Sequence, residues 1–279
     1  MKERARTAIN HCFSRSDYQT FLYDEVAKRL DARLENLRLD PKVILVSGFG
    51  SHGLKKRFPS KPEIIGFDFA HARLAIRRSK SRFNFPWMAK QVNVCGDLNA
   101  LPFASASVDM VYSNLDLPFF SECKELTHAL TEVHRILKPG GLFIFSSLGP
   151  DTLKELRRAE TQRGFRLCEH LDMHDLGDQM MAASFSDPVV DMEVLTLTYA
   201  DASSMMKDIR AHGSIALEAP ANPGLLGLGA FRSLAERSSA AESGRLNATC
   251  ELVFGHAWRA PTRISPKGQK VINIKMSQS

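Results

Sequence analysis

The chain has 279 residues, 44% hydrophobic and 24% charged, which is an ordinary balance for a globular protein with one large or two small domains. Its 37 basic and 31 acidic residues give a net charge of +6, so either an acidic partner or a solvated basic surface would explain the surplus. Five scattered cysteines without a CxxC pair argue against a disulfide scaffold or a zinc site, and they suit a reducing cytosol.

Other classes are excluded by what the sequence lacks. No apolar run approaches the roughly 20 residues of a membrane span, and the basic start of the chain has no apolar segment typical of a secretory signal. Zinc-finger spacing and an Arg-rich arm are also missing, so we do not expect a nucleic-acid partner. We expect a cytoplasmic protein without a metal site, and the sequence does not fix its oligomeric state.

The first helix is expected between Asp17 and Leu37, after a polar and basic stretch over residues 1–16. Its apolar residues recur mostly three or four positions apart and form one stripe: Phe21, Leu22, Val26, Leu30 and Leu34. Pro41 separates this helix from the first strand.

A glycine turn follows that strand. Val43 to Val46 form a short apolar run typical of a buried strand, Gly48 and Gly50 allow a tight turn, and a helical pattern starts at Leu54. Strand, glycine turn and helix open many nucleotide-binding α/β domains, because a backbone without Cβ can approach a ligand closely. Alone, the pattern is more often only a turn.

The second strand, Glu63 to Asp68, ends in a carboxylate about 20 residues beyond Gly48. In nucleotide-binding α/β folds an acidic residue at this place accepts hydrogen bonds from a ribose diol. The alternative is that Asp68 caps the helix expected over Ala70 to Ser79. We favour the ribose role because the carboxylate ends a buried strand.

Strands and helices then alternate, which predicts a parallel sheet with right-handed crossovers. The expected elements are strands at Val92–Cys95, Val108–Leu115 and Leu142–Ser147, and a helix at Leu126–Leu137 that Lys138-Pro139-Gly140-Gly141 ends.

An ordered set of motifs over residues 40–150 resembles class I S-adenosylmethionine-dependent methyltransferases. The motifs are Gly48-Phe49-Gly50, Gly66-Phe67-Asp68, Gly96-Asp97-Leu98, Leu101-Pro102-Phe103, Ser107-Val108-Asp109, Arg135-Ile136-Leu137 and Lys138-Pro139-Gly140-Gly141. The resemblance implies an α/β, Rossmann-like fold with a seven-stranded, mostly parallel sheet in the order 3-2-1-4-5-7-6. Helices would cover both faces, and the seventh strand would be antiparallel.

Later stretches resemble the malonyl-acyl-carrier protein O-methyltransferases of biotin synthesis. They are Ser146–Arg157, Asp172–Asp178, Asp187-Pro188-Val189, Leu195–Tyr199 and Gly255–Trp258. The resemblance implies S-adenosylmethionine as cofactor, the free carboxylate of a malonyl thioester as methyl acceptor, and acidic acyl-carrier protein as partner. Part of it is shared with an arginine-modifying, methyltransferase-like protein that helps assemble respiratory complex I.

The resemblance also implies the cofactor contacts. Gly48 and Gly50 would border the methionine end, Asp68 would bind the ribose hydroxyls, and Asp97 with Leu98 would edge the adenine; Asn114 would lie near the transferred methyl. A carboxylate acceptor is already ionised at pH 7, so no catalytic dyad is expected. Three arginines are candidates to hold that carboxylate: Arg15, Arg157 and Arg158.

Three residues depart from the family pattern. Val46 stands where the first strand usually carries an acidic residue, Phe49 replaces a small residue between the glycines, and His52 replaces the third glycine. Phe49 would either crowd the methionine moiety or pack aside. These changes leave open an alternative function: a catalytically impaired, methyltransferase-like protein that acts as a binding or assembly factor.

We expect three regions. Residues 1–40 form an N-terminal helical segment over the cleft, residues 41–258 form the methyltransferase domain, and residues 259–279 form a basic tail. Residues 150–245 would supply most of the substrate-side cover. Expected elements there are a helix opened by a Thr152/Glu155 capping box, helices at Met173–Phe185 (capped by Asp172 or Asp175) and Ala202–His212, and strands at Val189–Tyr199 and Cys250–Trp258.

Overall fold

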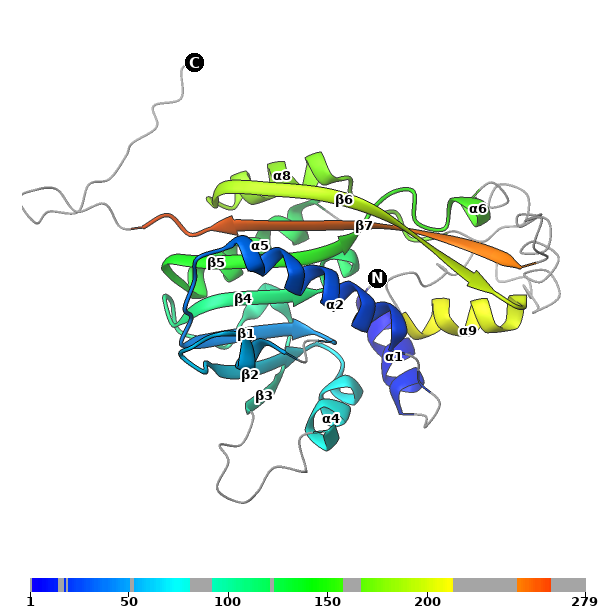
Figure 1. Ribbon diagram of the computed structural model, residues 1–279, viewed down its shortest axis with the longest axis horizontal. Helices are drawn as coiled ribbons and strands as arrows, with labels where there is room; N and C mark the ends of the chain where they lie inside the picture. Colours follow the sequence, from blue (N-terminus) through cyan, green and yellow to red (C-terminus); the bar gives the residue numbers. More distant parts are fainter. Residues whose placement is uncertain are drawn as a thin grey trace, which may run out of the picture.

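The computed structural model describes residues 2–14, 18, 20–50, 53–80, 92–120, 123–157, 167–212 and 245–261. Its centre is one seven-stranded sheet in the order β3-β2-β1-β4-β5-β7-β6 (Figure 1). All neighbouring strands pair in parallel except β7, which runs antiparallel to both β5 and β6. The predicted sheet order and the antiparallel seventh strand are therefore confirmed. The strands are β1 (Val43–Gly48), β2 (Glu63–Asp68), β3 (Val92–Cys95), β4 (Val108–Asn114), β5 (Leu137–Leu148), β6 (Ser186–Tyr199) and β7 (Leu246–Trp258).

Helices connect these strands and cover both faces of the sheet. The α-helices are α1 (Lys2–Phe13), α2 (Phe21–Arg33), α3 (Leu54–Arg57), α4 (His71–Lys80), α5 (Cys123–Ile136), α6 (Lys154–Arg157), α8 (Met173–Ala182) and α9 (Ala202–His212). Three short 3-10 turns complete the described elements: η1 (Leu34–Asn36), η2 (Leu98–Ala100) and η3 (Leu117–Phe119).

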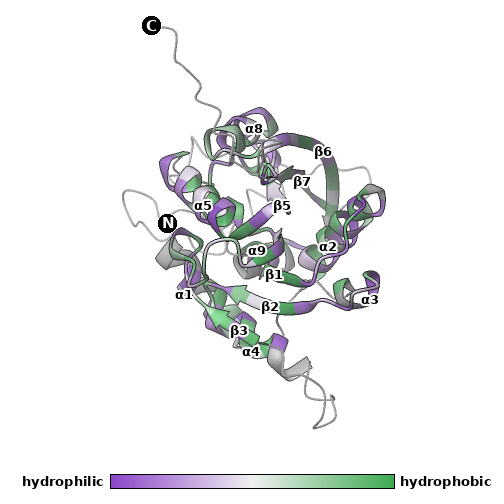
Figure 2. Cartoon of the chain, turned by 90° about the vertical axis from the view of Figure 1, so that its left-hand side faces the viewer, coloured by the Kyte–Doolittle hydropathy of each residue, from purple (hydrophilic) through white to green (hydrophobic). Residues whose placement is uncertain are grey.

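Alternate residues of the central strands point into two separate cores, as the two-residue period of a strand requires. Ile44 of β1 and Tyr112 of β4 pack with α1, α2 and α9 on one face, whereas Leu45 and Val111 pack with α5 and α8 on the other. Both faces of the inner strands are buried, which explains their nearly continuous apolar runs, drawn green in Figure 2.

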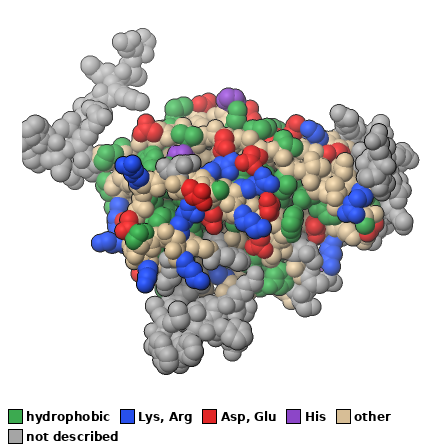
Figure 3. Space-filling view, in the orientation of Figure 1, with side chains coloured by type: hydrophobic (Ala, Val, Ile, Leu, Met, Phe, Trp, Pro, Cys, Tyr) green, Lys and Arg blue, Asp and Glu red, His purple; other side chains and the backbone are tan. Residues whose placement is uncertain are grey.

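Helix α2 buries Leu22, Val26 and Leu30 of its predicted apolar stripe, but Phe21 at its start is 59% exposed. The helix is shorter than expected, because the chain tightens into η1 after Arg33. Arg29 and Arg33 on its outer side pair with Asp191 and Glu193 of β6, with 2.8 Å between Arg33 Nη2 and Glu193 Oε1. Basic and acidic side chains are interspersed on this face of the molecule (Figure 3). The surplus of positive charge is thus not concentrated over α2.

The capping box predicted at Thr152 and Glu155 is wrong. The Thr152 hydroxyl donates to the Glu251 carbonyl, and the Glu155 carboxylate accepts bonds from the backbone and hydroxyl of Thr249. Both side chains are thus used to hold α6 against β7 instead of closing a helix end. The predicted continuation of that helix to about residue 160 lies partly outside the described residues.

Other boundaries shift for local reasons. Asp172 caps α8 through bonds from the backbone of His174 and Asp175, as one of the two predicted alternatives has it. The helix stops at Ala182, because Ser184 turns the chain at a φ of 68°. Strands β6 and β7 begin before their predicted starts and pair over their full length, so they extend past the rest of the sheet (Figure 1).

Candidate cofactor site

The candidate site lies at the carboxyl ends of β1, β2 and β4. The strand order reverses between β1 and β4, and open α/β sheets bind ligands in the crevice at such a point. Gly48, Asp68 and Asn114 are the last residues of these three strands, so the sheet brings three of the predicted cofactor residues together. Helices α1, α4 and α9 gather at the same end (Figure 1).

The glycine turn needs glycine at two positions. Gly48 and Gly50 have φ values of 81° and 103°, which side chains rarely tolerate. A Cβ on Gly48 would lie 2.2 Å from the Asn114 carbonyl oxygen, and one on Gly50 would lie 2.8 Å from the carbonyl oxygen of Tyr23. The turn is therefore packed closely against β4 on one side and against α2 on the other.

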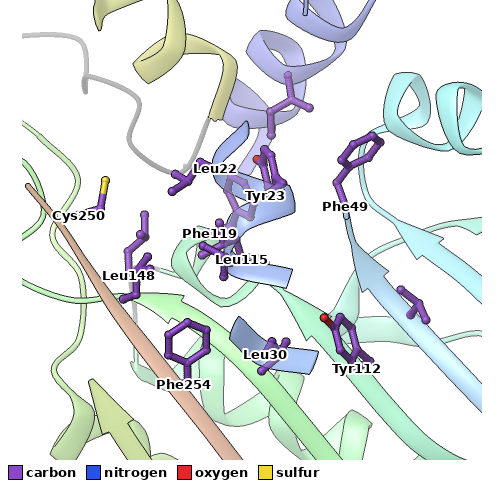
Figure 4. Close-up of a cluster of buried hydrophobic side chains, with 14 of the residues drawn as sticks. Leu22, Tyr23, Leu30, Phe49, Tyr112, Leu115, Phe119, Leu148, Cys250 and Phe254 are labelled. Carbon is purple, nitrogen blue, oxygen red and sulfur yellow. The ribbon is translucent and has the colours of Figure 1, made fainter. Parts of the chain in front are cut away.

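Phe49 packs aside instead of crowding the turn. Its ring centroid lies 5.4 Å from that of Phe13 and 6.0 Å from that of Tyr23, both at edge-to-face angles. These rings join α1, α2 and the turn into one buried cluster, part of which is drawn in Figure 4. Val46 is buried within β1, and its carbonyl accepts a bond from Arg77. His52, the third departure, lies outside the described residues.

Asp68 is fully buried and its carboxylate is already engaged. Arg73, five residues later on α4, places Nε 2.9 Å from Oδ2 and Nη2 2.9 Å from Oδ1. Oδ1 also accepts a bond of 2.7 Å from the backbone of Ala70, the residue before α4, so the side chain closes the turn that leads into this helix. In this arrangement Arg73 contacts the carboxylate that a ribose is expected to bind.

A second buried carboxylate, Asp116, lies beside this pair. Its Oδ1 is 3.5 Å from Arg73 Nη2, and its Oδ2 accepts a bond from the Ser47 hydroxyl. Burial and the neighbouring Asp68 charge raise the pKa of Asp116 to about 7. Burial alone would lower the pKa of Arg73, but the attraction of the carboxylates raises it instead, so the guanidinium stays charged.

Asn114 ties the strand ends to α2. Its amide nitrogen donates to the Tyr23 carbonyl at 3.0 Å and to the Phe49 carbonyl, and its oxygen accepts from Ser146 at 2.8 Å. The buried amide thus satisfies both its donor and acceptor groups within the protein. Its predicted place near the transferred methyl stays a prediction.

A small pocket with about 20 Å³ of free space, partly open to solvent, lies among residues at the end of β2 and residues that follow β3 and β4. Its lining residues are Phe67, Phe69, Asp97, Leu98, Asp116, Phe119 and Phe120. Its walls are mostly aromatic and carry two carboxylates, those of Asp97 and Asp116, and its free space is about that of one water molecule. Asp97 and Leu98, predicted to edge the adenine, thus line this pocket, and their contact with the base stays a prediction.

Of the three predicted arginines, Arg15 and Arg158 lie outside the described residues. Arg157 is described and lies away from this site, in the region of α6, where it donates to the Cys168 carbonyl at 2.7 Å. A buried arginine of the cleft is Arg73, which was not predicted from the sequence. It could have been found from its spacing, because an arginine in the first turn after β2 is within reach of the carboxylate at the end of that strand.

Comparisons with known proteins agree with this geometry. A methyltransferase domain model matches residues 46–145. The malonyl-acyl-carrier protein O-methyltransferase of Gallionella capsiferriformans is 38% identical, with 96% of this chain and 95% of that protein covered. The same enzyme of Methylovorus sp. is 35% identical, with 98% and 95% covered. The chain belongs to the malonyl-acyl-carrier protein O-methyltransferase family. The alternative of an impaired assembly factor is not favoured.

Solved structures support the fold of this family member. A protein of Bacillus halodurans assigned as a methyltransferase aligns with a TM-score of 0.60 at 14% identity, covering 85% of this chain and 99% of that one. YcgJ of Bacillus subtilis aligns with a TM-score of 0.58 at 15% identity, covering 84% and 98%. At such low identity these matches establish the class I methyltransferase fold alone.

S-adenosylmethionine is the cofactor of this family. The strand ends carry groups of the kind it needs: a glycine turn without side chains and the carboxylate of Asp68. In this structure Arg73 contacts both oxygens of Asp68, so a ribose diol would have to replace the guanidinium there. In the part of the chain that the structure describes, no helix is long and apolar enough to cross a membrane, and no cluster of side chains is placed to hold a metal ion.

Proposed function

We propose that this protein methylates the free carboxylate of a malonyl thioester carried on acyl-carrier protein, with S-adenosylmethionine as methyl donor. The observation that carries the proposal is the match to enzymes of that name over nearly the whole length of both chains. This length is greater than that of the methyltransferase domain model, residues 46–145, so it supports the proposal for the region after β5, which we propose as the substrate-side cover.

The proposed cofactor residues are those that meet at the strand ends. Gly48 and Gly50 would border the amino-acid end, Asp68 would accept the ribose hydroxyls, and Asp97 with Leu98 would edge the adenine. Asn114 would lie near the methyl group. The burial of Asp68 and Asn114 supports these roles, because buried polar groups hold a fixed geometry only when fully satisfied.

The proposed reaction needs few functional groups from the protein. When bound, S-adenosylmethionine supplies the methyl group: a carboxylate oxygen lone pair forms the new O–CH3 bond while the S–CH3 bond breaks and its electron pair returns to sulfur. No proton moves, because the acceptor is ionised before the reaction and the product is a neutral ester. The chain must therefore align the acceptor and keep water out, and no general base is needed.

Esterification would also explain why such an acceptor is used. A free carboxylate costs several kcal/mol to bury in an apolar pocket, whereas its methyl ester is neutral. Masking the charge would let chain-elongation enzymes accept the product as they accept an ordinary acyl chain. We place the protein in biotin precursor synthesis, in the cytoplasm, without a nucleic-acid partner.

The test is transfer of a radiolabelled methyl group to malonyl-acyl-carrier protein. Acetyl-acyl-carrier protein, which lacks the free carboxylate, is the matched control acceptor. We expect label on the malonyl form alone, as a base-labile ester. Label on neither acceptor, together with no calorimetric binding of S-adenosylmethionine, would favour the catalytically impaired alternative.

A further inference from the structure

Arg73 is a charged side chain buried at the centre of the cofactor site. It has no solvent exposure, and its guanidinium lies between the rings of Tyr23, Phe69 and Phe119, with its Cζ 5.1–5.8 Å from the three ring centroids. Burying a charge in this way is costly unless partners compensate, and here the partner is Asp68. The partner is also the residue that the cofactor is expected to need.

The ion pair and the ribose compete for the same two oxygens. Asp68 Oδ1 accepts bonds from Ala70 and Arg73, and Oδ2 faces Arg73 Nε. A ribose diol that donates to both oxygens would have to displace the guanidinium from at least one of them. Because the diol is neutral, this exchange would weaken the closest ion pair of Arg73 and leave Asp116, whose Oδ1 lies 3.5 Å from Arg73 Nη2, as its other carboxylate.

Of three other groups near Arg73, Tyr23 and His212 are neutral, and Asp116, 3.5 Å away, is the one that carries a negative charge when ionised. The Tyr23 hydroxyl accepts from Arg73 Nη1 at 3.2 Å, and burial raises the pKa of Tyr23 to about 12, so the phenol stays neutral. His212 of α9 packs edge-to-face on the Tyr23 ring, and burial lowers its pKa to about 4, so it too is neutral. Asp116 can share a proton near pH 7.

His212 offers a second polar group to the same space. Its Nδ1 is buried without a hydrogen-bond partner, and its backbone carbonyl accepts from the Tyr23 hydroxyl at 2.8 Å. A buried polar nitrogen without a partner carries a desolvation penalty that a ligand could relieve. The guanidinium, the phenol and the imidazole come from α4, α2 and α9, which meet with α1 over the strand ends.

We propose that Arg73 binds the carboxylate of the methyl acceptor, and that Asp68 is its partner only while the ribose is absent. The inference rests on the proposed function and adds a residue to it. A guanidinium presents a planar fork that matches a carboxylate, and it can hold one oxygen while the other attacks the methyl group. Binding would then be ordered, because the cofactor must release Arg73 before the acceptor can be held.

The first measurement is calorimetry with S-adenosylhomocysteine on the parent and on Arg73→Met. Removing the competing guanidinium should leave the affinity unchanged or tighten it several-fold. Arg29→Met, which removes an arginine from an ion pair on the outer side of α2, is the matched control and should bind like the parent. If Arg73→Met bound S-adenosylhomocysteine tenfold or more weakly than the parent, Arg73 would support cofactor binding. The proposal that the ribose replaces Arg73 at Asp68 would then be wrong.

The second measurement concerns the acceptor and does not need turnover. With S-adenosylhomocysteine saturating, malonyl-N-acetylcysteamine should bind Arg73→Met at least tenfold more weakly than the parent, whereas acetyl-N-acetylcysteamine should not distinguish them. In the methylation assay the same variant should raise the KM for malonyl-acyl-carrier protein. Equal malonyl binding in both proteins would overturn the proposal.

The experiments distinguish a failure of the proposed function from a failure of the proposed role of Arg73. If malonyl-acyl-carrier protein is methylated equally well by the parent and the variant, the function stands and the role of Arg73 falls. If the parent methylates no malonyl acceptor but binds malonyl-N-acetylcysteamine through Arg73, the opposite holds. Should Arg73→Met not fold, Arg73→Lys keeps the charge and loses the fork; it must still weaken malonyl binding while sparing S-adenosylhomocysteine, or the proposal is wrong.

Discussion

At the scale of single residues, the site depends on buried charged side chains that lie next to one another. Two carboxylates, Asp68 and Asp116, face the fully buried Arg73. Arg77 lies behind them and donates to the carbonyls of Val46 and Gly48, where burial lowers its pKa. The sequence predicts Asp68 from its place at a strand end. It does not predict the arginine, because an ion pair across a helix turn is not visible in apolar periodicity.

We predict that Asp68→Ala weakens S-adenosylhomocysteine binding by tenfold or more. Each charge-linked hydrogen bond to the ribose is worth about 1.5–3 kcal/mol, and the variant loses both. It also leaves Arg73 buried without its main partner, which should lower the free energy of unfolding by about 3–5 kcal/mol. Calorimetry and denaturant titration measure the two effects. Asp191→Ala, at an exposed ion pair, is the control. If Asp68→Ala bound S-adenosylhomocysteine as well as the parent, Asp68 would not bind the ribose, and its role would be limited to the turn before α4 and the ion pair with Arg73.

Asp116 should make stability fall as the pH rises. Its pKa is raised to about 7 by burial and by Asp68, whereas an aspartate in an unfolded chain titrates near 4. Between these values the folded protein keeps a proton that the unfolded chain has released. The contribution is therefore complete below about pH 4 and is lost as the pH rises through 7.

The measurement is the free energy of unfolding from pH 4 to 8 for the parent and Asp116→Asn. Relative to the variant, the parent should lose up to about 1.4 kcal/mol per pH unit inside this window and nothing above it. Asp109→Asn is a control that should show no slope in this window: despite partial burial, bonds from Lys138 and the backbone lower the pKa of Asp109, so its contribution is lost only as the pH falls below about 4. Parallel curves for the parent and Asp116→Asn would refute the shift.

At the scale of elements, the strands β1 to β4 were predicted more accurately than β5, β6 and β7, which begin earlier than expected. Buried strands such as β1 and β4 are short apolar runs bounded by turns, and sequence shows both features directly. The start of α6 depends on contacts with β7, which lies far away in the chain. The Thr152/Glu155 motif failed for this reason: both side chains found stronger partners on β7 than at a helix end.

The glycine turn between β1 and α3 yields an element-scale prediction. Gly48 and Gly140 have nearly equal φ values, 81° and 79°, but only Gly48 is crowded by backbone. A Cβ at Gly48 would lie 2.2 Å from the Asn114 carbonyl oxygen, whereas a Cβ at Gly140 meets no atom within 4 Å. Gly140→Ala should therefore cost only the backbone strain, about 1–2 kcal/mol.

Gly48→Ala should cost clearly more than Gly140→Ala, because β1 and β4 must separate to admit the methyl group. Thermal unfolding of both variants measures the difference, and S-adenosylhomocysteine binding should be lost only in the Gly48 variant. Equal melting temperatures would show that the strand ends can relax around the new side chain, and would remove steric packing as the reason for glycine there.

At the scale of the whole molecule, the sheet order was predicted because alternating strands and helices admit few topologies. What could not be predicted is the meeting of α1, α2, α4 and α9 over the strand ends. Tyr23 and His212 are 189 residues apart, yet the Tyr23 hydroxyl bonds to the His212 carbonyl. No local pattern contains such a contact. The regions predicted at residues 1–40, 41–258 and 259–279 remain proposals, and residues 262–279 lie outside the described part of the chain.

The last prediction concerns the charge of the whole chain. A net charge of +6 should attract an acidic carrier protein over long range, and salt screens such attraction within about 10 Å at 0.1 M. We expect kcat/KM for malonyl-acyl-carrier protein to fall steadily as NaCl is raised from 0.02 to 0.5 M, through an increase in KM. These salt concentrations are on the order of those that span strong and weak screening.

The control for this prediction is a small acceptor in the same assay. Malonyl-N-acetylcysteamine carries the same reacting carboxylate without the acidic carrier, so its methylation should depend much less on salt. S-adenosylhomocysteine affinity should also stay nearly constant, because its contacts lie in the buried cleft, where screening is weak. If kcat/KM fell equally with salt for both acceptors, the salt effect would act in the cleft. The positive net charge would then not contribute to recognition of the carrier protein.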